Sequence, residues 1–202
     1  MLFRFVKLLI NNKTNSFPTI ISDNLILREL RNSDAEEIAK IITERVIKYL
    51  LASIPYPYKI SDGLDFIQDG KISFELDKSV RWAIELKSKS MIKDYHYRDD
   101  DLPQSLFGGI ISVENIDNSN KNGNVGFWLG ERFWNKRIGT EARRAVTCYF
   151  LSPNNKIELH KLYAYIFSSN IYSCKIFENT GFTKEGTLKE HFVYVRYHEI
   201  RN

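Results

Sequence analysis

The chain has 202 residues, of which 43% are hydrophobic and 27% charged, and its formal net charge is +4. This composition excludes an intrinsically disordered chain, and the length fits one domain with a substantial core. The small positive charge suits an anionic cofactor, but it is too small to favour nucleic acid, which we exclude as a partner.

Residues 1–21 are expected to form an N-terminal arm or an extra strand that packs on a domain formed by residues 22–202. The apolar run Met1–Ile10 contains Arg4 and Lys7, so it is too short and too charged to span a membrane. The first 22 residues contain no acid, which leaves an organelle targeting segment as an alternative. We expect a cytoplasmic protein with no membrane partner.

Strand and helix patterns alternate in the first half of the chain. Leu25–Leu30 alternates as a strand, and Ser33–Glu36 carries a capping-box pattern that begins a helix. A second helix is predicted from Ser61 to Leu76, and a strand at Arg81–Leu86 follows it. The stretch Lys87–Ser105 is longer than a usual hairpin connection, so we expect a surface flap there.

The second half continues the same alternation. Strands are predicted at Leu106–Val113, in the stretch that ends at Gly130, and at Leu159–Phe167. A helix begins near Ile138, and closing strands fall within Thr183–Tyr197. The order of elements indicates an α/β (α+β) fold.

The most informative stretch is Gly126–Ala142, which has the pattern of a strand, a short basic loop and the start of a helix. The first backbone N–H groups of a helix have no partner within it, and the helix dipole adds positive charge there. Lys136 and Arg137 lie in the loop beside these donors. Together they predict an anion site that suits a phosphorylated ligand.

Cysteine and histidine usage gives no sign of a metal or a disulfide. Cys148 and Cys174 are the only cysteines, and we expect them to be thiols in a reducing compartment. The four histidines are scattered and no zinc pattern occurs, so no metal site is predicted.

Three blocks, in matching order, resemble the GNAT superfamily of N-acyltransferases in its RimJ/RimL-like branch. Asn24–Ala35 is similar to the family's opening strand and first helix. Gly126–Ala142 is similar to its acyl-CoA loop, although Asn135 and Arg137 replace two family glycines. His160–Phe182 is similar to the next strand, the Asn-x-x-Ser helix start and the Gly-Phe turn.

The resemblance implies a twisted, mostly antiparallel sheet of about six or seven strands, with helices on both faces. It implies that the sheet splits between the strands that end at Gly130 and Phe167, and that acetyl-CoA lies in this split. The implied function is an acetyl-CoA-dependent N-acetyltransferase acting on a primary amine, in a monomer or a homodimer. A protein or peptide N-terminus, a polyamine and an antibiotic stay open as acceptors. A non-catalytic CoA-binding module is the rival interpretation.

The resemblance also assigns contacts with the cofactor. The predicted cofactor-binding residues are Phe127, Trp128, Leu129, Trp134, Asn135, Lys136, Arg137, Ile138, Gly139, Thr140, Asn170, Ser173 and Phe177. Two alternatives stay open for Arg137: its Cβ could narrow the approach to phosphate, or its guanidinium could bind phosphate. Asn170 also suits the N-cap of a helix.

Catalytic roles are less well defined. Ser173 is the predicted proton donor to the departing thiolate, with Tyr172 as the competing hydroxyl. The family often has a glutamate where this chain has Asn124, so Glu114, across a predicted turn, is the candidate base.

Glu85 and Glu131 are further candidates for the base. An acceptor α-amine, with a reference pKa of about 8, needs no strong base. The flap and the segment Pro55–Tyr58 are expected to shape the acceptor site. Asp99–Asp101 favours a cationic acceptor, or else forms an acidic surface turn.

Overall fold

The computed structural model describes residues 9–10, 16–50, 54–88, 106–152 and 157–198. In these ranges nine strands form one sheet in the order β1-β2-β3-β4-β5-β6-β7-β9-β8. All neighbouring strands in it are antiparallel except β6 and β7, which are parallel. The predicted fold class is confirmed, and the sheet is wider than the predicted one.

The elements have the following bounds. The strands are β1 (Leu9–Ile10), β2 (Ile20–Ile21), β3 (Leu25–Glu29), β4 (Val80–Leu86), β5 (Phe107–Asp117), β6 (Asn122–Leu129), β7 (Lys161–Phe167), β8 (Thr183–Thr187) and β9 (His191–Tyr197). The helices are α1 (Asp34–Ile41), α2 (Glu44–Ile47), α3 (Ile60–Glu75), the 3₁₀ helix η3 (Glu131–Phe133), α4 (Ile138–Phe150) and α5 (Ile171–Glu178).

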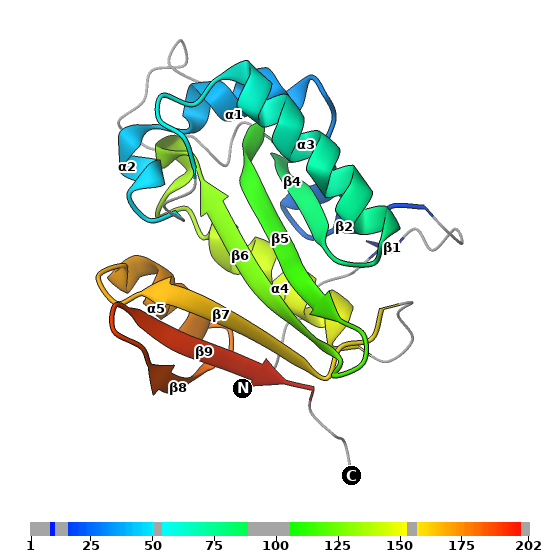
Figure 1. The fold of residues 1–202 in the computed structure, drawn as a ribbon, viewed down its shortest axis with the longest axis vertical. Coiled ribbons are helices and arrows are strands. Elements are labelled where there is room, and N and C mark those ends of the chain that lie inside the picture. Colours follow the sequence, from blue (N-terminus) through cyan, green and yellow to red (C-terminus); the bar gives the residue numbers. More distant parts are fainter. Residues whose placement is uncertain (1–8, 11–15, 51–53, 89–105, 153–156, 199–202) are drawn as a thin grey trace.

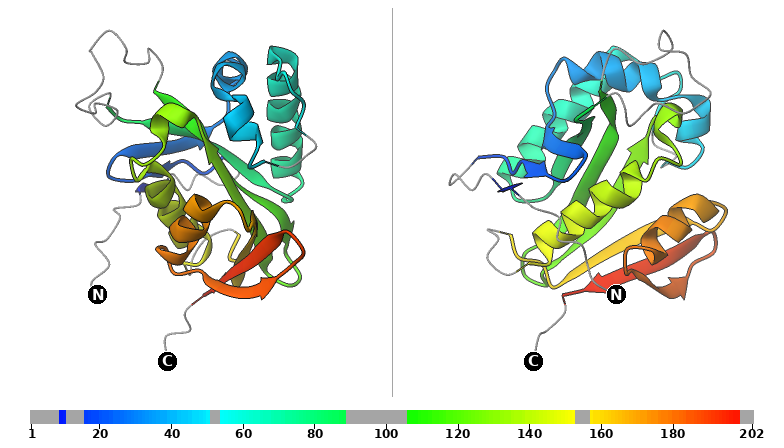
Figure 2. Two further views of the ribbon diagram at one scale, coloured as in Figure 1. Left: turned by 90° about the vertical axis from the view of Figure 1, so that its left-hand side faces the viewer. Right: turned by 180° about the vertical axis from the view of Figure 1, so that it is seen from behind.

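Helices cover both faces of the sheet, as predicted. Figures 1 and 2 show α1 and α3 on one face and α4 and α5 on the other. Because strand side chains alternate between faces, Trp82 and Ile84 join the large core beneath α4. Ala83, between them in β4, joins the smaller core beneath α1 and α3.

The sheet is split between β6 and β7. These strands pair at three positions only, Asn122–Asn124 of β6 with Lys161–Tyr163 of β7. Beyond these pairs β6 continues to Leu129 and β7 to Phe167, and Figure 1 shows the two strands diverging. This is the split that the sequence predicts.

The N-terminal segment packs on the sheet. β2 pairs with β3, and the Phe17 ring lies 5.9 Å from Trp82 and 5.0 Å from Phe74, measured between ring centroids. The Trp82 indole Nε1–H donates to the carbonyl oxygen of Pro18 at 2.6 Å.

Most of the predicted flap, residues 89–105, lies outside the described residues, and so does the run 1–8. No helix in the described ranges is long and apolar enough to cross a membrane.

Replacing Trp82 with phenylalanine tests how the N-terminal segment is attached. The substitution leaves a small cavity and removes the indole donor, so the buried Pro18 carbonyl loses its partner. We expect Trp82→Phe to lower the free energy of unfolding by about 2 kcal/mol, measured by urea denaturation. Tyr197→Phe, on an exposed ring, is the control and should change stability by less than about 0.5 kcal/mol. Equal stability of both variants would contradict this account of the attachment.

Candidate functional site

Backbone polar groups of β6 point into the split. The Gly130 N–H donates to the Gly108 carbonyl at 3.0 Å, so the polar groups of Gly130 are directed at β5. In an antiparallel ladder this direction alternates from one residue to the next. The N–H and C=O groups of Phe127 and Leu129 therefore point away from β5, toward the split.

The facing strand has the same arrangement. Ser168, which follows β7, donates its N–H to the Glu190 carbonyl at 2.9 Å, on the β9 side. The alternation then directs the polar groups of Tyr165 and Phe167 into the split. Both walls of the split thus present backbone hydrogen-bonding edges to its interior.

The last carbonyl of each wall is bound by the segment that follows it. The Trp134 indole Nε1–H donates to the Leu129 carbonyl at 2.8 Å. The Asn170 N–H donates to the Phe167 carbonyl, also at 2.8 Å. The N–H group of Leu129 remains directed into the split, where it can donate to a ligand.

The loop between β6 and α4 is held in a glycine-like conformation. Asn135 and Arg137 have φ angles of 61° and 60°, in the left-handed region. These are the two positions at which the chain departs from the family's glycines. An arginine in this region costs about 1 kcal/mol, whereas an asparagine adopts it more readily, so the backbone strain falls mainly on Arg137.

The first turn of α4 offers backbone donors beside this loop. The first helical hydrogen bond runs from the Glu141 N–H to the Arg137 carbonyl at 3.0 Å. The N–H groups of Ile138, Gly139 and Thr140 precede this bond, so they project from the helix start. Arg137 is exposed and lies next to them, and the site fits a phosphate.

Gly139 allows α4 to lie close to β6. A Cβ at this position would be 2.9 Å from Cε2 of Phe127 and 3.5 Å from Cδ1 of Leu129. The missing side chain therefore faces the strand. The contact brings the donors of the first helical turn beside the end of β6.

Glu141 is a structural anchor that the sequence reasoning did not find. Its carboxylate accepts from the Ser22 hydroxyl at 2.6 Å and from the Asn24 N–H at 2.8 Å. The Asn24 amide Nδ2 adds a third bond at 2.9 Å. The signal was present in Thr140–Ala142, at the end of the stretch that resembles the family's acyl-CoA loop. The glutamate of this run fixes the start of α4 to the β2–β3 turn.

The start of α5 brings two of the predicted residues together. The Asn170 side-chain oxygen accepts from the Ser173 N–H at 3.1 Å, which makes Asn170 the N-cap. Ser173 is half-buried and lies one turn before the buried Phe177. Tyr172 is 63% exposed, so its ring lies away from this inner side of the helix.

The side chains of Phe127 and Trp128 lie on opposite faces of the sheet. Phe127 packs on the large core, and its ring centroid is 6.2 Å from that of Phe177. Trp128 packs on the smaller core, together with Tyr58.

Burial raises the pKa of Tyr58 to about 12, with Asp62 and Asp65 adding to the effect. Tyr58 therefore stays protonated and does not act as a base.

Glu114 lies where the hairpin was expected to bring it, opposite Asn124 at the end of the β6–β7 pairing. Its carboxylate is ion-paired with Arg81, Oε1 to Nε at 2.8 Å. Arg81 also binds Asp69 at 2.7 Å and donates to the Phe66 carbonyl at 3.0 Å. An acceptor amine would therefore compete with Arg81 for this carboxylate.

The other two candidate bases are paired with arginines as well. Glu85 binds Arg28, which also binds Asp34 at 2.8 Å. Glu131 binds Arg45 at 2.6 Å and accepts from the hydroxyl of Thr43. The first pair joins β4 to β3, and the second joins the 3₁₀ helix η3 to α2, which gives these carboxylates structural roles.

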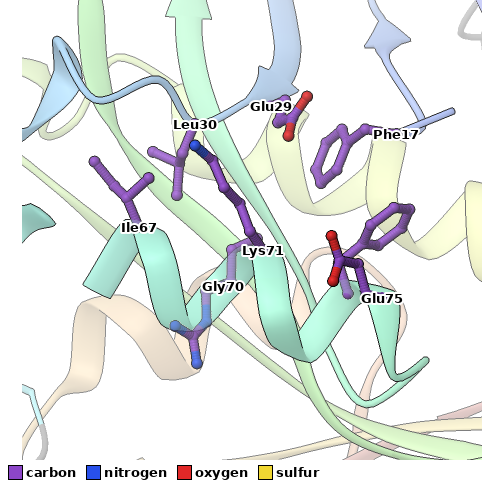
Figure 3. Close-up of a pocket in the computed structure, with 9 residues that line it drawn as sticks. Phe17, Glu29, Leu30, Ile67, Gly70, Lys71 and Glu75 are labelled. Carbon is purple, nitrogen blue, oxygen red and sulfur yellow. The ribbon is translucent and has the colours of Figure 1, made fainter. Parts of the chain in front are cut away.

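A separate cavity of about 280 Å³ lies between α3 and the N-terminal segment (Figure 3). Its lining includes Phe17, Glu29, Phe74 and Glu75. In the sheet order β4, β5 and β6 lie between β3 and the split, so this cavity is not part of the candidate site. In the described ranges no three His, Cys, Asp or Glu side chains gather as metal ligands.

Comparison with known proteins identifies the family. Residues 24–183 match the acetyltransferase (GNAT) domain, so the chain belongs to the GNAT family of acetyltransferases. It is 24% identical over 177 residues to the uncharacterized N-acetyltransferase YoaA of Bacillus subtilis, covering 87% of this chain and 88% of YoaA. The enzyme class, the cofactor acetyl-CoA and the RimJ/RimL-like resemblance are confirmed, which sets aside the non-catalytic alternative.

Solved structures share the fold. The microcin C7 self-immunity acetyltransferase MccE, solved with acetyl-CoA and AMP, superposes with a TM-score of 0.68 at 22% identity, covering 87% of this chain and 93% of MccE. RimL, a ribosomal L7/L12 α-N-protein acetyltransferase solved with CoA, superposes with a TM-score of 0.70 at 17% identity. That match covers 88% of this chain and 96% of RimL.

The two left-handed loop residues provide a matched pair of tests. Arg137→Gly relieves backbone strain, so we expect unfolding free energy to rise by about 0.5–1 kcal/mol. It also removes a cation from the anion site, so CoA affinity, measured by calorimetry, should fall about threefold or more. Asn135→Gly relieves a smaller strain without changing charge, and should stabilise the protein less, at unchanged affinity.

Binding of CoA to Arg137→Gly that is tighter than wild-type binding would show that the Arg137 Cβ hinders the phosphate. Unchanged affinity would place the guanidinium outside the anion site.

Proposed function

We propose that this enzyme acetylates α-amines, at the N-terminus of a protein or peptide. The observation that carries the proposal is the state of the three candidate bases. Among the described residues, each of the three candidate bases, Glu85, Glu114 and Glu131, is paired with an arginine. Because these three carboxylates are engaged, we infer that the enzyme favours an acceptor amine that arrives already neutral.

Reference pKa values separate the acceptor classes. An α-amine with a pKa of about 8 is about one-fifth neutral at pH 7.4, whereas a lysine side chain with a pKa near 10.4 is about one-thousandth neutral. An enzyme without a strong base therefore reacts far faster with α-amines at equal binding. RimL, named as an α-N-protein acetyltransferase, shares this fold, and that agrees with the proposal.

The chain's own groups would act on the thioester in a defined order. Acetyl-CoA supplies the activated acetyl group. The start of α4 would hold its pyrophosphate, and the walls of the split would pair with its amide-containing arm as an added strand does. The Leu129 N–H, directed into the split, would donate to the thioester carbonyl oxygen as charge develops on it.

Ser173 would protonate the departing thiolate. It lies in the first turn of α5, where the helix dipole favours a negative charge, and its N–H is fixed by the Asn170 cap. Its position on the inner side of α5 supports this role over Tyr172, whose ring is 63% exposed. The acceptor amine would release its proton to solvent, and Ser173 would regain a proton from solvent.

Ser173→Ala tests the proton donor. Because the leaving-group proton matters mainly in the transition state, kcat should fall by about 100-fold while the KM for acetyl-CoA changes little. Tyr172→Phe is the matched control and should keep wild-type kcat. Steady-state thiol release measures both variants, and their melting temperatures report folding. Full activity in Ser173→Ala, with loss in Tyr172→Phe, would transfer the role to Tyr172.

The acceptor class is tested with a panel of amines and acetyl-CoA. Peptide α-amines should have a higher kcat/KM than lysine side chains, and the rate should rise with pH through the free amine's own pKa. Glu114→Gln should change kcat/KM by less than about threefold, because Arg81 already occupies this carboxylate. A large loss in that variant would instead identify Glu114 as the base. Good turnover of polyamines or aminoglycosides, with none of peptides, would refute the N-terminal acceptor.

A further inference from the structure

Arg143 is a buried cation with few partners. It lies in α4, its residue is 0% exposed, and its Nη2–H donates to the Ile176 carbonyl of α5. The guanidinium carbon stands 4.1 Å from the centroid of the Phe177 ring and 5.2 Å from that of Phe182. Its Nε and Nη1 atoms are buried and have no hydrogen-bond partner within the described residues.

This arrangement is costly for the fold. Burial lowers the pKa of Arg143 to about 8, and the charges of Arg144 and Arg196 add to the effect. A buried cation without an ion-pair partner is less stable than an apolar side chain of similar volume. The contacts with the two rings and the single hydrogen bond offset only part of this cost, so native-state stability gives little reason for an arginine at this position.

The location suggests a different reason. The C-terminal arm, residues 161–197, joins β6 through three paired positions, 122–124 with 161–163. Nothing in that short ladder fixes the spacing further along, where Leu129 and Phe167 diverge. The spacing there depends on the contact of α5 with α4 and β6 behind the split, and Arg143 provides the buried hydrogen bond of this contact.

Arg143 acts on a rigid end of α5. Gly181, with a φ of 82°, donates its N–H to Glu178 at 3.0 Å, and the Phe182 N–H donates to Phe177 at 3.1 Å. These two bonds close the helix in a Schellman motif. The bond from Arg143 to Ile176 therefore attaches α4 to a rigid C-terminal end of α5. Because α5 is a single short helix, its position relative to α4 also determines the position of Ser173 at its N-terminal end.

We propose that Arg143 is a positioning residue that sets the separation of α4 and α5, and with it the width of the split. Its loss relaxes the split and weakens CoA binding while leaving the fold intact. The inference rests on the proposed placement of CoA in the split.

Arg143→Met separates binding from stability. Methionine fills most of the same volume beside the two rings, and the Ile176 carbonyl keeps a bond from the Thr180 hydroxyl at 3.0 Å. We expect an equal or higher melting temperature, because an unpaired buried charge is removed. The Kd for CoA, measured by calorimetry, should rise about tenfold, since small displacements of binding groups are costly.

Two further variants control the test. Arg143→Lys keeps a donor for Ile176 and should restore part of the affinity. Arg144→Met removes the neighbouring charge from an exposed position, where Arg144 donates to the Asn179 carbonyl at 3.3 Å. The Kd of Arg144→Met for CoA should stay within about twofold of the wild-type value.

In Arg143→Met, the KM for acetyl-CoA should rise more than kcat falls.

Wild-type affinity in Arg143→Met would overturn the inference. A lower melting temperature in that variant would overturn it too, because the arginine would then serve the fold. Equal losses of affinity in Arg143→Met and Arg144→Met would show a general charge effect and also refute it. Failure of the wild-type protein itself to bind CoA would instead refute the placement of the cofactor on which the inference rests.

Discussion

The end of hydrogen bonding between β6 and β7, after Asn124 and Tyr163, is the constraint on which the rest of the structure depends. A sheet normally satisfies the backbone groups of every internal strand, and unsatisfied groups cost free energy when water is excluded. Here the two strands part while still flanked by α4 and α5. Their backbone edges therefore remain available to a ligand that pairs as an added strand would.

The surrounding contacts preserve this opening. Trp134 and Asn170 bind the terminal carbonyl of each wall, which leaves a short and defined edge for recognition. Gly139 brings the positive end of α4 against β6, and Glu141 fixes that helix to the β2–β3 turn. The backbone edge of β6 and the first turn of α4 thus lie side by side, and a few side chains outside the split hold them in place.

Much of this was predictable from sequence, because the signals are local. Apolar alternation identified the long strands, and the change to a basic loop and a helical run identified the anion site. An arm or an extra strand was expected within residues 1–21, but the positions of the two-residue strands β1 and β2 were not, since two residues show no periodicity and their pairing depends on tertiary packing. The arginine partners of Glu114 and Glu131 come from distant parts of the chain, so no spacing could predict them. The burial of Arg143 contradicts the usual preference of its side chain and was not expected.

The narrow attachment of the C-terminal arm also has a consequence for the energy landscape of the protein. The arm has aromatic packing of its own, in which Phe177 contacts Phe182 and Tyr194. A segment with its own packing and few backbone bonds to its neighbour opens as a cooperative unit, at a free energy below that of global unfolding. Acetyl-CoA bound in the proposed position would join the two parts of the sheet and raise the free energy of that opening, so cofactor binding and the cooperativity of the fold would be linked.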